Sequence, residues 1–238
     1  MKKIRKAYWL LAAILFCGLF TDAFAQRFEP KDTWPFLYEN FTDGTLYSST
    51  GEVLLSAPMN VSVLNQKLYY LKGETIMEAD MVRMYAAKIS NGLVQEVYVN
   101  VGAKMYRVLA ESEGGAAIQA DILDVERYKK ASIGYGVTSY TASTQNVSGM
   151  AMEAAAGVNI NKATASREGG EPLPILEKKY ILFGQGRIVP ALKREVMDIP
   201  DLDKQAAKEF FKENKIKWNQ AASLTQVADF LTNNLKHE

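Results

Sequence analysis

The stretch VRMYAAKISNGLVQEVYVNV, residues 82–101, decides the fold class of this chain. Two strand-like runs, 82–89 and 93–101, flank the turn residues Ser90, Asn91 and Gly92. Asn-Gly between two such runs is a strong short-range signal for a tight turn that joins antiparallel strands. The stretch therefore predicts a β-hairpin.

Short apolar runs separated by turn residues extend outward from this hairpin, from about Trp34 to Leu123. Gly51 and Gly73 stand in turns, where glycine adopts positive φ at low cost. The runs are 45–47, 53–55, 61–64, 67–71, 74–77, 105–109 and 117–120. Turn signals every eight to twelve residues are typical of antiparallel β structure. We expect about six to nine strands here.

The C-terminal part combines one more hairpin with helices. The runs 178–183 and 187–189 flank Gly184-Gln185-Gly186 and predict two paired strands, and a short helix is predicted over 191–197. Asp201 or Asp203 is expected to cap a helix that reaches about Asn214, and Ser223 with Gln226 forms a capping box for the last helix. The apolar face of the first of these helices comprises Leu202, Ala206, Ala207, Phe210 and Phe211. The apolar face of the last helix comprises Leu224, Val227, Phe230, Leu231 and Leu235. The fold class predicted is α+β, with a predominantly antiparallel β N-terminal region, then a β-hairpin and two to three amphipathic helices.

Residues 141–170 differ from both flanking parts, because Ala, Gly, Ser, Thr and Asn occupy 20 of 30 positions. Few large apolar side chains are present to form a core, so we interpret the stretch as an exposed loop or linker, or alternatively as an arm that orders on a partner. The predicted organisation is 1–25 signal peptide, 26–140 antiparallel β region, 141–170 small-residue loop or linker, and 171–238 hairpin plus helical C-terminal region.

The first 25 residues have the pattern of a secretory signal. Lys2, Lys3, Arg5 and Lys6 precede an apolar run at 7–20, which ends before Ala23-Phe24-Ala25. We expect cleavage before Gln26 and export to the periplasm or cell exterior, with no stable membrane span afterwards. A retained anchor is the alternative, but the run is shorter than the roughly 20 residues that span a bilayer. Lipidation at Cys17 is disfavoured because Phe16, a large residue, precedes it.

Composition excludes several classes of protein. With 48% hydrophobic and 23% charged residues, the chain is too apolar to be disordered. The leader holds four of the 28 Lys and Arg and one of the 27 Asp and Glu, so the chain from Gln26 onward has 24 against 26, a net charge of −2. This balance argues against a nucleic-acid partner. The same part of the chain lacks cysteine, which excludes disulfides and thiol catalysis there.

Catalytic and cofactor motifs are scarce. His237, next to the C-terminus, is the single histidine of the chain. The sequence therefore argues against a Ser-His-Asp triad and against histidine-rich metal sites. The glycine pairs at 134–136 and 184–186 lack the third glycine of a dinucleotide-binding fingerprint. We therefore assign no catalytic, cofactor-binding or metal residue and expect no cofactor.

Two groups of carboxylates remain as weaker candidates. Glu74, Glu78 and Asp80 could supply a glycosidase pair, which needs two carboxyl groups roughly 5–10 Å apart, but a solvated strand face explains them equally well. A second group, Asp198, Asp201 and Asp203, suggests calcium. It lacks the order of a calcium loop and stands where a helix favours acidic residues.

An aromatic group and a lysine run also have two interpretations. Residues 34–38, WPFLY, together with Phe41 could stack on a sugar or peptide, but such a group more often fixes an N-terminal segment to its own core. The lysines Lys204, Lys208, Lys212, Lys215 and Lys217 alternate with Glu209 and Glu213. Such alternation is typical of a solvated helix face.

Several segments resemble a group of exported proteins of Bacteroidetes-type Gram-negative bacteria. The segments are YGVTSYTAS at 135–143, KYIL at 179–182 ahead of GRIVPALK at 186–193, and FFKENKIK at 210–217. No catalytic residues are defined in that group, so the resemblance implies an envelope location and no site. We expect an exported, non-catalytic envelope protein that acts by binding or structural interaction, its partner an unknown envelope protein or glycan. The alternative is a glycan hydrolase that uses carboxylates alone.

Overall fold

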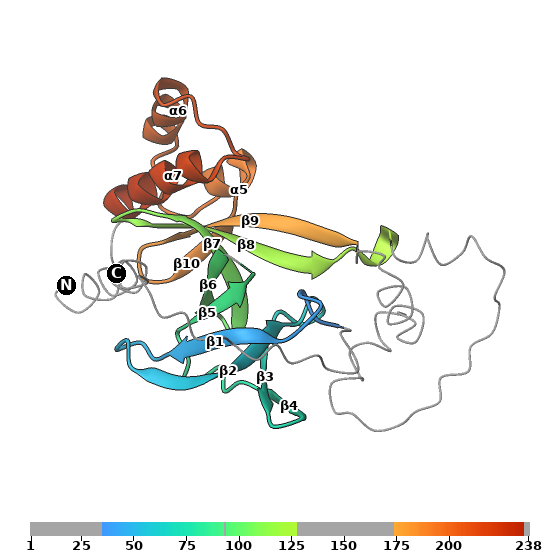
Figure 1. Ribbon diagram of the computed structural model, residues 1–238. Helices are drawn as coiled ribbons and strands as arrows, with labels where there is room; N and C mark the ends of the chain where they lie inside the picture. The colour runs from blue at the N-terminus through green and yellow to red at the C-terminus, as the bar shows by residue number, and fades with distance from the viewer. Residues whose placement is uncertain (1–34, 93, 128–173, 236–238) are drawn as a thin grey trace.

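The computed structural model describes residues 35–92, 94–127 and 174–235, which form a β-rich α+β fold (Figure 1). Ten strands make one antiparallel sheet, and three helices follow it in the chain. The strands are β1 Thr42–Tyr47, β2 Val53–Val61, β3 Leu68–Lys72, β4 Thr75–Glu78, β5 Ala86–Asn91, β6 Val94–Val101, β7 Lys104–Glu111, β8 Gly115–Leu123, β9 Ile175–Phe183 and β10 Arg187–Pro190. The helices are α5 Lys193–Met197, α6 Lys204–Glu213 and α7 Ala221–Asn234. The predicted leader and the small-residue stretch 141–170 lie outside the described residues.

The sheet consists of two meanders joined side by side. Its strand order is β10-β9-β8-β7-β6-β5-β1-β2-β3-β4, so β1 lies between β2 and β5. In Figure 1 strands β1 to β4 lie below, and β8 to β10 lie above them beneath the helices. Strand β8 pairs with β9 from Gly115↔Phe183 to Leu123↔Ile175. The sheet therefore continues across the boundary predicted between the 26–140 and 171–238 regions.

Tight turns set the registers of the hairpins. Strand β5 pairs with β6 through Asn91↔Val94, and Gly92 has φ +64° at the turn, as the Asn-Gly signal predicts. Strand β5 begins at Ala86, whereas the sequence suggested Val82. The difference arises because the Asp80 carboxylate accepts the Val82 N–H and the Asp80 carbonyl accepts the Met84 N–H, which together form a turn. Eight strands fall between Trp34 and Leu123, within the predicted number.

Strands β7 and β8 diverge at one end, and the β2–β3 loop fills the gap. Their ladder ends at Arg107↔Gln119. Beyond that pair, the Met105 N–H donates to the Gln66 carbonyl at 2.7 Å and the Leu123 N–H donates to the Val63 carbonyl at 3.0 Å. The β2–β3 loop, which was predicted in part as a strand over 61–64, thus joins the first meander to the second.

The sequence predicted the N-cap of α6 correctly and that of α7 wrongly. Asp203 caps α6 by accepting from the N–H groups of Gln205 and Ala206, one of the two options predicted. Helix α7 begins at Ala221 with Gln220 as its N-cap and no side-chain cap bond, so the predicted capping box was wrong. Ser223 lies inside the first turn, because the chain already enters the helix two residues earlier.

Besides two smaller apolar clusters, the described residues form two large apolar cores along the sheet. One packs α5–α7 against β8 and β9, with Ile181, Leu224 and Leu231 at 0% exposure, and the other joins the first meander to β5–β7. Gly114 and Gly115 allow α7 and β9 to approach the start of β8 closely. A Cβ on Gly115, for example, would lie 2.0 Å from the Leu182 carbonyl oxygen. Among the helices described, none has the length and apolar character needed to cross a bilayer.

Candidate functional site

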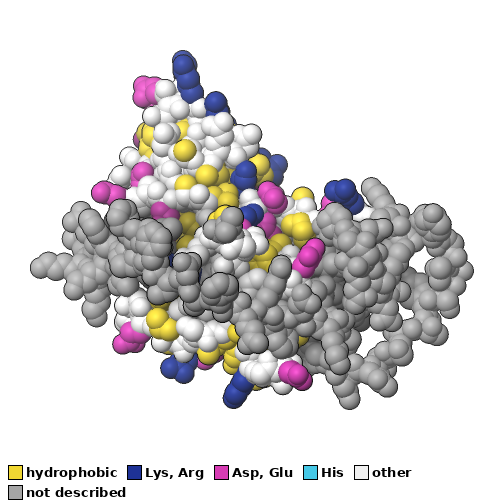
Figure 2. All heavy atoms as spheres, in the orientation of Figure 1, with side chains coloured by type: hydrophobic (Ala, Val, Ile, Leu, Met, Phe, Trp, Pro, Cys, Tyr) yellow, Lys and Arg dark blue, Asp and Glu magenta, His cyan; other side chains and the backbone are white. Residues whose placement is uncertain are grey.

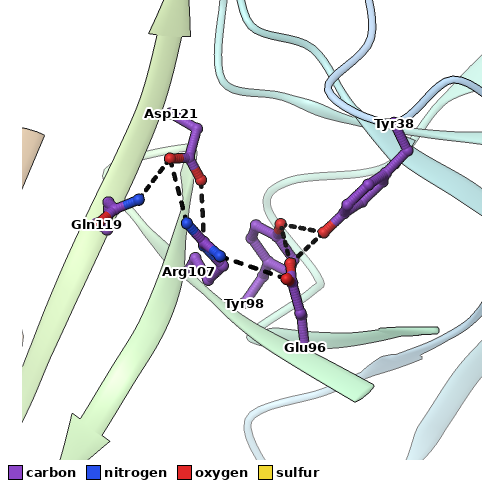
Figure 3. Close-up of polar contacts among 6 residues, drawn as sticks. All are labelled: Tyr38, Glu96, Tyr98, Arg107, Gln119 and Asp121. Atoms are coloured by element: carbon purple, nitrogen blue, oxygen red, sulfur yellow. Dashed lines mark hydrogen bonds and ion pairs between the residues drawn. The ribbon is translucent and has the colours of Figure 1, made fainter. Parts of the chain in front are cut away.

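A cluster of polar side chains lies on β6, β7 and β8, between the two apolar cores. Its members are Tyr38, Glu96, Tyr98, Arg107, Gln119 and Asp121 (Figure 3). Register places Tyr98 beside Arg107 and Arg107 beside Gln119, so the three strands present these side chains on one face. Tyr38 reaches the cluster from the segment that precedes β1. The cluster sits where β7 and β8 diverge.

The Arg107 guanidinium forms the centre of the cluster. Its Nη1 lies 3.3 Å from Glu96 Oε1, and its Nε lies 3.2 Å from Asp121 Oδ2. The Nε–Oδ2 contact is an ion pair whose hydrogen-bond geometry is not aligned. The Gln119 amide donates to Asp121 Oδ1 at 2.6 Å. One cation therefore bridges two carboxylates whose side chains are only 15% and 5% exposed.

Two tyrosine hydroxyls complete the shell of Glu96. Tyr38 Oη donates to Glu96 Oε2, Tyr98 Oη donates to the same oxygen at 3.0 Å, and the two hydroxyls also contact each other. Burial, more than the neighbouring Glu96 carboxylate, raises the pKa of Tyr38 far above its ordinary value. The pKa of Tyr98 is raised as well, again mainly by burial. Both phenols stay protonated donors at neutral pH, and neither is a phenolate nucleophile.

Burial is also the main influence on the protonation of the Asp121 carboxyl group. It raises the pKa of Asp121, while the hydrogen bond from Gln119 and the charge of Arg107 partly oppose the increase. The pKa of Arg107 is raised by Asp121 and Glu96, although its own burial acts in the opposite direction. The charges in the cluster therefore depend on one another, as expected of buried ion pairs.

We call this arrangement the brace, because neighbouring side chains engage both of its carboxylates. A glycosidase needs one carboxyl group that is free to donate a proton and another that faces the sugar or a water. Here Glu96 and Asp121 are both engaged by Arg107, and their other oxygens accept from Tyr38, Tyr98 or Gln119. The cluster ties the segment before β1 to β6, β7 and β8.

The predicted carboxylate trio lies elsewhere. Glu74, Glu78 and Asp80 are all exposed at one end of the sheet, around edge strand β4. Glu78 Oε1 pairs with Lys67 Nζ at 2.5 Å, and the Asp80 carboxylate is used in the turn before β5. These positions fit the plainer interpretation, a solvated surface.

The aspartates considered for calcium have local structural roles. Asp198 is the C-cap of α5, and Asp203 is the N-cap of α6. Asp201 has φ +63° between the two helices. Within residues 35–92, 94–127 and 174–235, no three His, Cys, Asp or Glu side chains lie close enough to hold a metal ion.

The aromatic group at 34–41 mainly fixes its own segment, as the sequence suggested. Phe36 and Phe41 are 4% and 1% exposed, and their rings meet edge to face at 4.7 Å. The fully buried Asn60 accepts from the Tyr38 N–H and donates to the carbonyls of Tyr38 and Asn40. The segment is therefore held firmly over β2. Trp34 lies outside the described residues.

A groove of about 550 Å³ adjoins this segment. The described residues that line it are 37–43 on one side and 90–92 on the other. Strands β1 and β5 pair only as far as Gly44↔Ile89, so the groove occupies the fork beyond that pair. Glu39, Asp43 and Asn91 are exposed, and Thr42 Oγ1 is buried without a hydrogen-bond partner.

The sequence did not reveal the cluster or the groove. Glu96 and Tyr98 lie two residues apart in the hairpin that decides the fold, and Gln119 and Asp121 lie two residues apart in a later strand. Each pair therefore shares one face of its strand by period-two alternation, while Arg107 lies in the strand between them. That alternation was visible, but nothing in it marks which strands are neighbours. Pairing across three strands, together with Tyr38 from another segment, brings the residues together.

Basic and acidic side chains are interspersed over the described surface seen in Figure 2, with no large patch of one sign. This pattern agrees with the near-neutral charge of the chain and offers no basic face for phosphates on the side shown. Comparisons with models of protein families, with curated proteins and with solved structures gave no match.

Proposed function

We propose that this chain is an exported, non-catalytic envelope protein that acts by binding or structural interaction. The observation that supports the proposal is the brace around Arg107, in which two largely buried carboxylates pair with one cation and accept from neutral donors. A carboxylate that is paired with a buried cation is less available for proton transfer, and buried ion pairs contribute conformational specificity in some proteins. The groove between β1 and β5 then offers this rigid sheet a place to bind a ligand.

The location rests on the N-terminal sequence. A basic leader, an apolar run and Ala23-Phe24-Ala25 favour export with cleavage before Gln26. The intact mass of the protein recovered from a Gram-negative host tests this part of the proposal. A chain that starts at Gln26 in the periplasmic or extracellular fraction supports it, and a full-length chain that stays in membranes contradicts it.

The alternative, a glycan hydrolase that uses carboxylates alone, predicts a different response to mutation. We would assay Glu96→Gln, Asp121→Asn and Glu78→Gln on a panel of oligosaccharides, with Glu113→Gln as an exposed control. If the protein is a binding module, neither the unmodified chain nor any variant releases sugars, and Glu96→Gln changes only stability. Hydrolysis by the unmodified chain that disappears in one folded variant would refute the binding proposal.

A further inference from the structure

The turn between β5 and β6 presents a chemically reactive pair of residues. Asn91 is the last residue of β5, and Gly92 follows it in the turn with φ +64°. Both residues are exposed, and they form the single Asn-Gly pair of the chain. Asparagine amides are thermolabile, and a glycine after the asparagine leaves the next backbone nitrogen least hindered for attack on that amide.

The two groups that would react with each other are not engaged elsewhere. Within the part of the chain that the structure describes, no hydrogen bond holds the Asn91 side-chain amide or the Gly92 N–H. A Cβ placed on Gly92 would have no heavy atom within 4 Å outside its chain neighbours. The turn therefore leaves the amide, the nitrogen and the surrounding water free to meet.

Other asparagines of the sheet and helices are held differently. The Asn100 amide, in β6, donates to the carbonyls of Met81 and Met84 at 2.6 and 2.9 Å. A residue with a side chain follows Asn100, as it follows every asparagine except Asn91. Further amides that donate hydrogen bonds are those of Asn60, Asn65, Asn214 and Asn234.

The single Asp-Gly pair of the chain, Asp43-Gly44, provides an internal comparison. Aspartate before glycine cyclises by the same route, so the sequence alone does not separate the two pairs. Gly44, however, lies inside the sheet and pairs with Ala57 on β2 and with Ile89 on β5. Its main chain is held on both sides, whereas Gly92 lies in a turn.

We propose that Asn91 is a site of spontaneous deamidation in the folded protein. The Gly92 backbone nitrogen bonds to Asn91 Cγ while the bond from Cγ to the side-chain nitrogen breaks, and that nitrogen leaves as ammonia with the proton of the Gly92 N–H. Water then adds to either carbonyl of the resulting succinimide and opens the ring to aspartate or isoaspartate. The inference does not depend on the proposed function.

The products change both charge and geometry at the end of the hairpin. A carboxyl group is ionised at neutral pH, so either product adds one negative charge to the groove that Glu39 and Asp43 also line. Isoaspartate in addition carries the main chain through the side-chain methylene. Because Asn91↔Val94 is the last pair of its ladder, the extra carbon alters the turn and leaves the pairing from Ser90↔Gln95 inward.

The test follows the purified protein by peptide mapping as it ages in buffer. Trypsin releases residues 89–104, a peptide that contains both Asn91 and Asn100. Tandem mass spectrometry locates the converted residue, and labelling by an isoaspartyl methyltransferase detects isoaspartate. We expect conversion at Asn91 while Asn100 stays intact, at a rate that rises with pH because the attacking nitrogen must lose its proton. Conversion of the two asparagines at equal rates would overturn the inference.

A comparison with the protein unfolded in guanidinium chloride isolates the effect of structure. Asn91 should convert in the folded protein within about tenfold of its unfolded rate, a barrier difference of about 1.4 kcal/mol. Isomerisation at Asp43 should be slowed by more than that factor on folding, because both ladders hold Gly44. An Asn91 that stays intact in the folded protein while it converts in the unfolded chain would refute the proposal.

Matched variants identify the reacting groups. Asn91→Gln keeps an amide but requires a larger ring, so position 91 should stay unmodified. Gly92→Ala places a methyl group beside the attacking nitrogen and should slow conversion at Asn91 at least about tenfold. Gly73→Ala is its control, because Gly73 also has φ +64° in a turn and no neighbour within 4 Å. An equal slowing by Gly73→Ala would show that turn strain, not the Gly92 nitrogen, controls the reaction.

Discussion

Replacing Arg107 with methionine tests whether the polar cluster is a brace. The change keeps most of the side-chain length and removes the cation with which Glu96 and Asp121 pair among the described residues. Both carboxylates then stay in a poorly solvated place without a counter-ion. Removing one partner of a buried ion pair costs roughly 3–5 kcal/mol. Because the Arg107 side chain is 27% exposed, we expect the lower end, about 3 kcal/mol.

The loss should depend on pH in a defined direction. Burial already raises the pKa of Asp121 in the folded protein above its unfolded value of about 3.9. A carboxyl group with a raised folded pKa binds protons better when folded, so stability falls as pH rises through that interval. Without Arg107, the pKa of Asp121 should rise further, because the charge of Arg107 opposes the increase. The penalty should therefore be largest near pH 7 and should shrink toward pH 4.

Urea unfolding followed by far-ultraviolet circular dichroism at several pH values measures the penalty. Arg194→Met is the control, because Arg194 pairs with Glu195 at the surface with 84% of its side chain exposed. An exposed pair of this kind contributes about 0–1 kcal/mol. A triple variant, Arg107→Met with Glu96→Gln and Asp121→Asn, should recover much of the loss because no charge remains buried.

A penalty below about 1 kcal/mol for Arg107→Met, identical at pH 4 and pH 7, would refute the reasoning. Such a result would mean that water solvates the carboxylates as well as the guanidinium does. The cluster would then be a polar surface feature, and the brace could not serve as support for a non-catalytic role.

Four further substitutions test the β8–β9 contact and the capping and packing of the helices, each by its urea midpoint. Gly115→Ala should cost at least roughly 2 kcal/mol, since its Cβ would lie 2.0 Å from the Leu182 carbonyl oxygen, and an unchanged midpoint would show that β8 and β9 can separate there. Asp203→Ala should cost about 1 kcal/mol through the lost N-cap of α6, whereas Ser223→Ala should cost well below that, and equal losses would restore the capping box. Leu231→Ala, at 0% exposure, should cost about 2–5 kcal/mol, and a negligible loss would show that α7 does not pack on the sheet.

The amino-acid sequence determined the local elements of this protein. Gly51 and Gly92 terminate strands because they accept the positive φ that tight turns need, and that requirement is independent of the rest of the fold. The cap of α6 at Asp203 is equally local. Helix α7 was predicted with the right apolar face and the wrong start, since packing of Leu224 and Leu231 fixes the helix more strongly than a capping side chain does.

Only the tertiary structure decided which elements became neighbours. The sequence pattern is the same whether β1 pairs with β2 alone or also with β5, yet that second pairing joins the two meanders and leaves the fork that forms the groove. The brace around Arg107 likewise needs three strands in register and Tyr38 from a separate segment. Period-two alternation tells which side chains share a face of one strand, but long-range pairing is selected by the packing of the whole core, and therefore the sites emerged only in three dimensions.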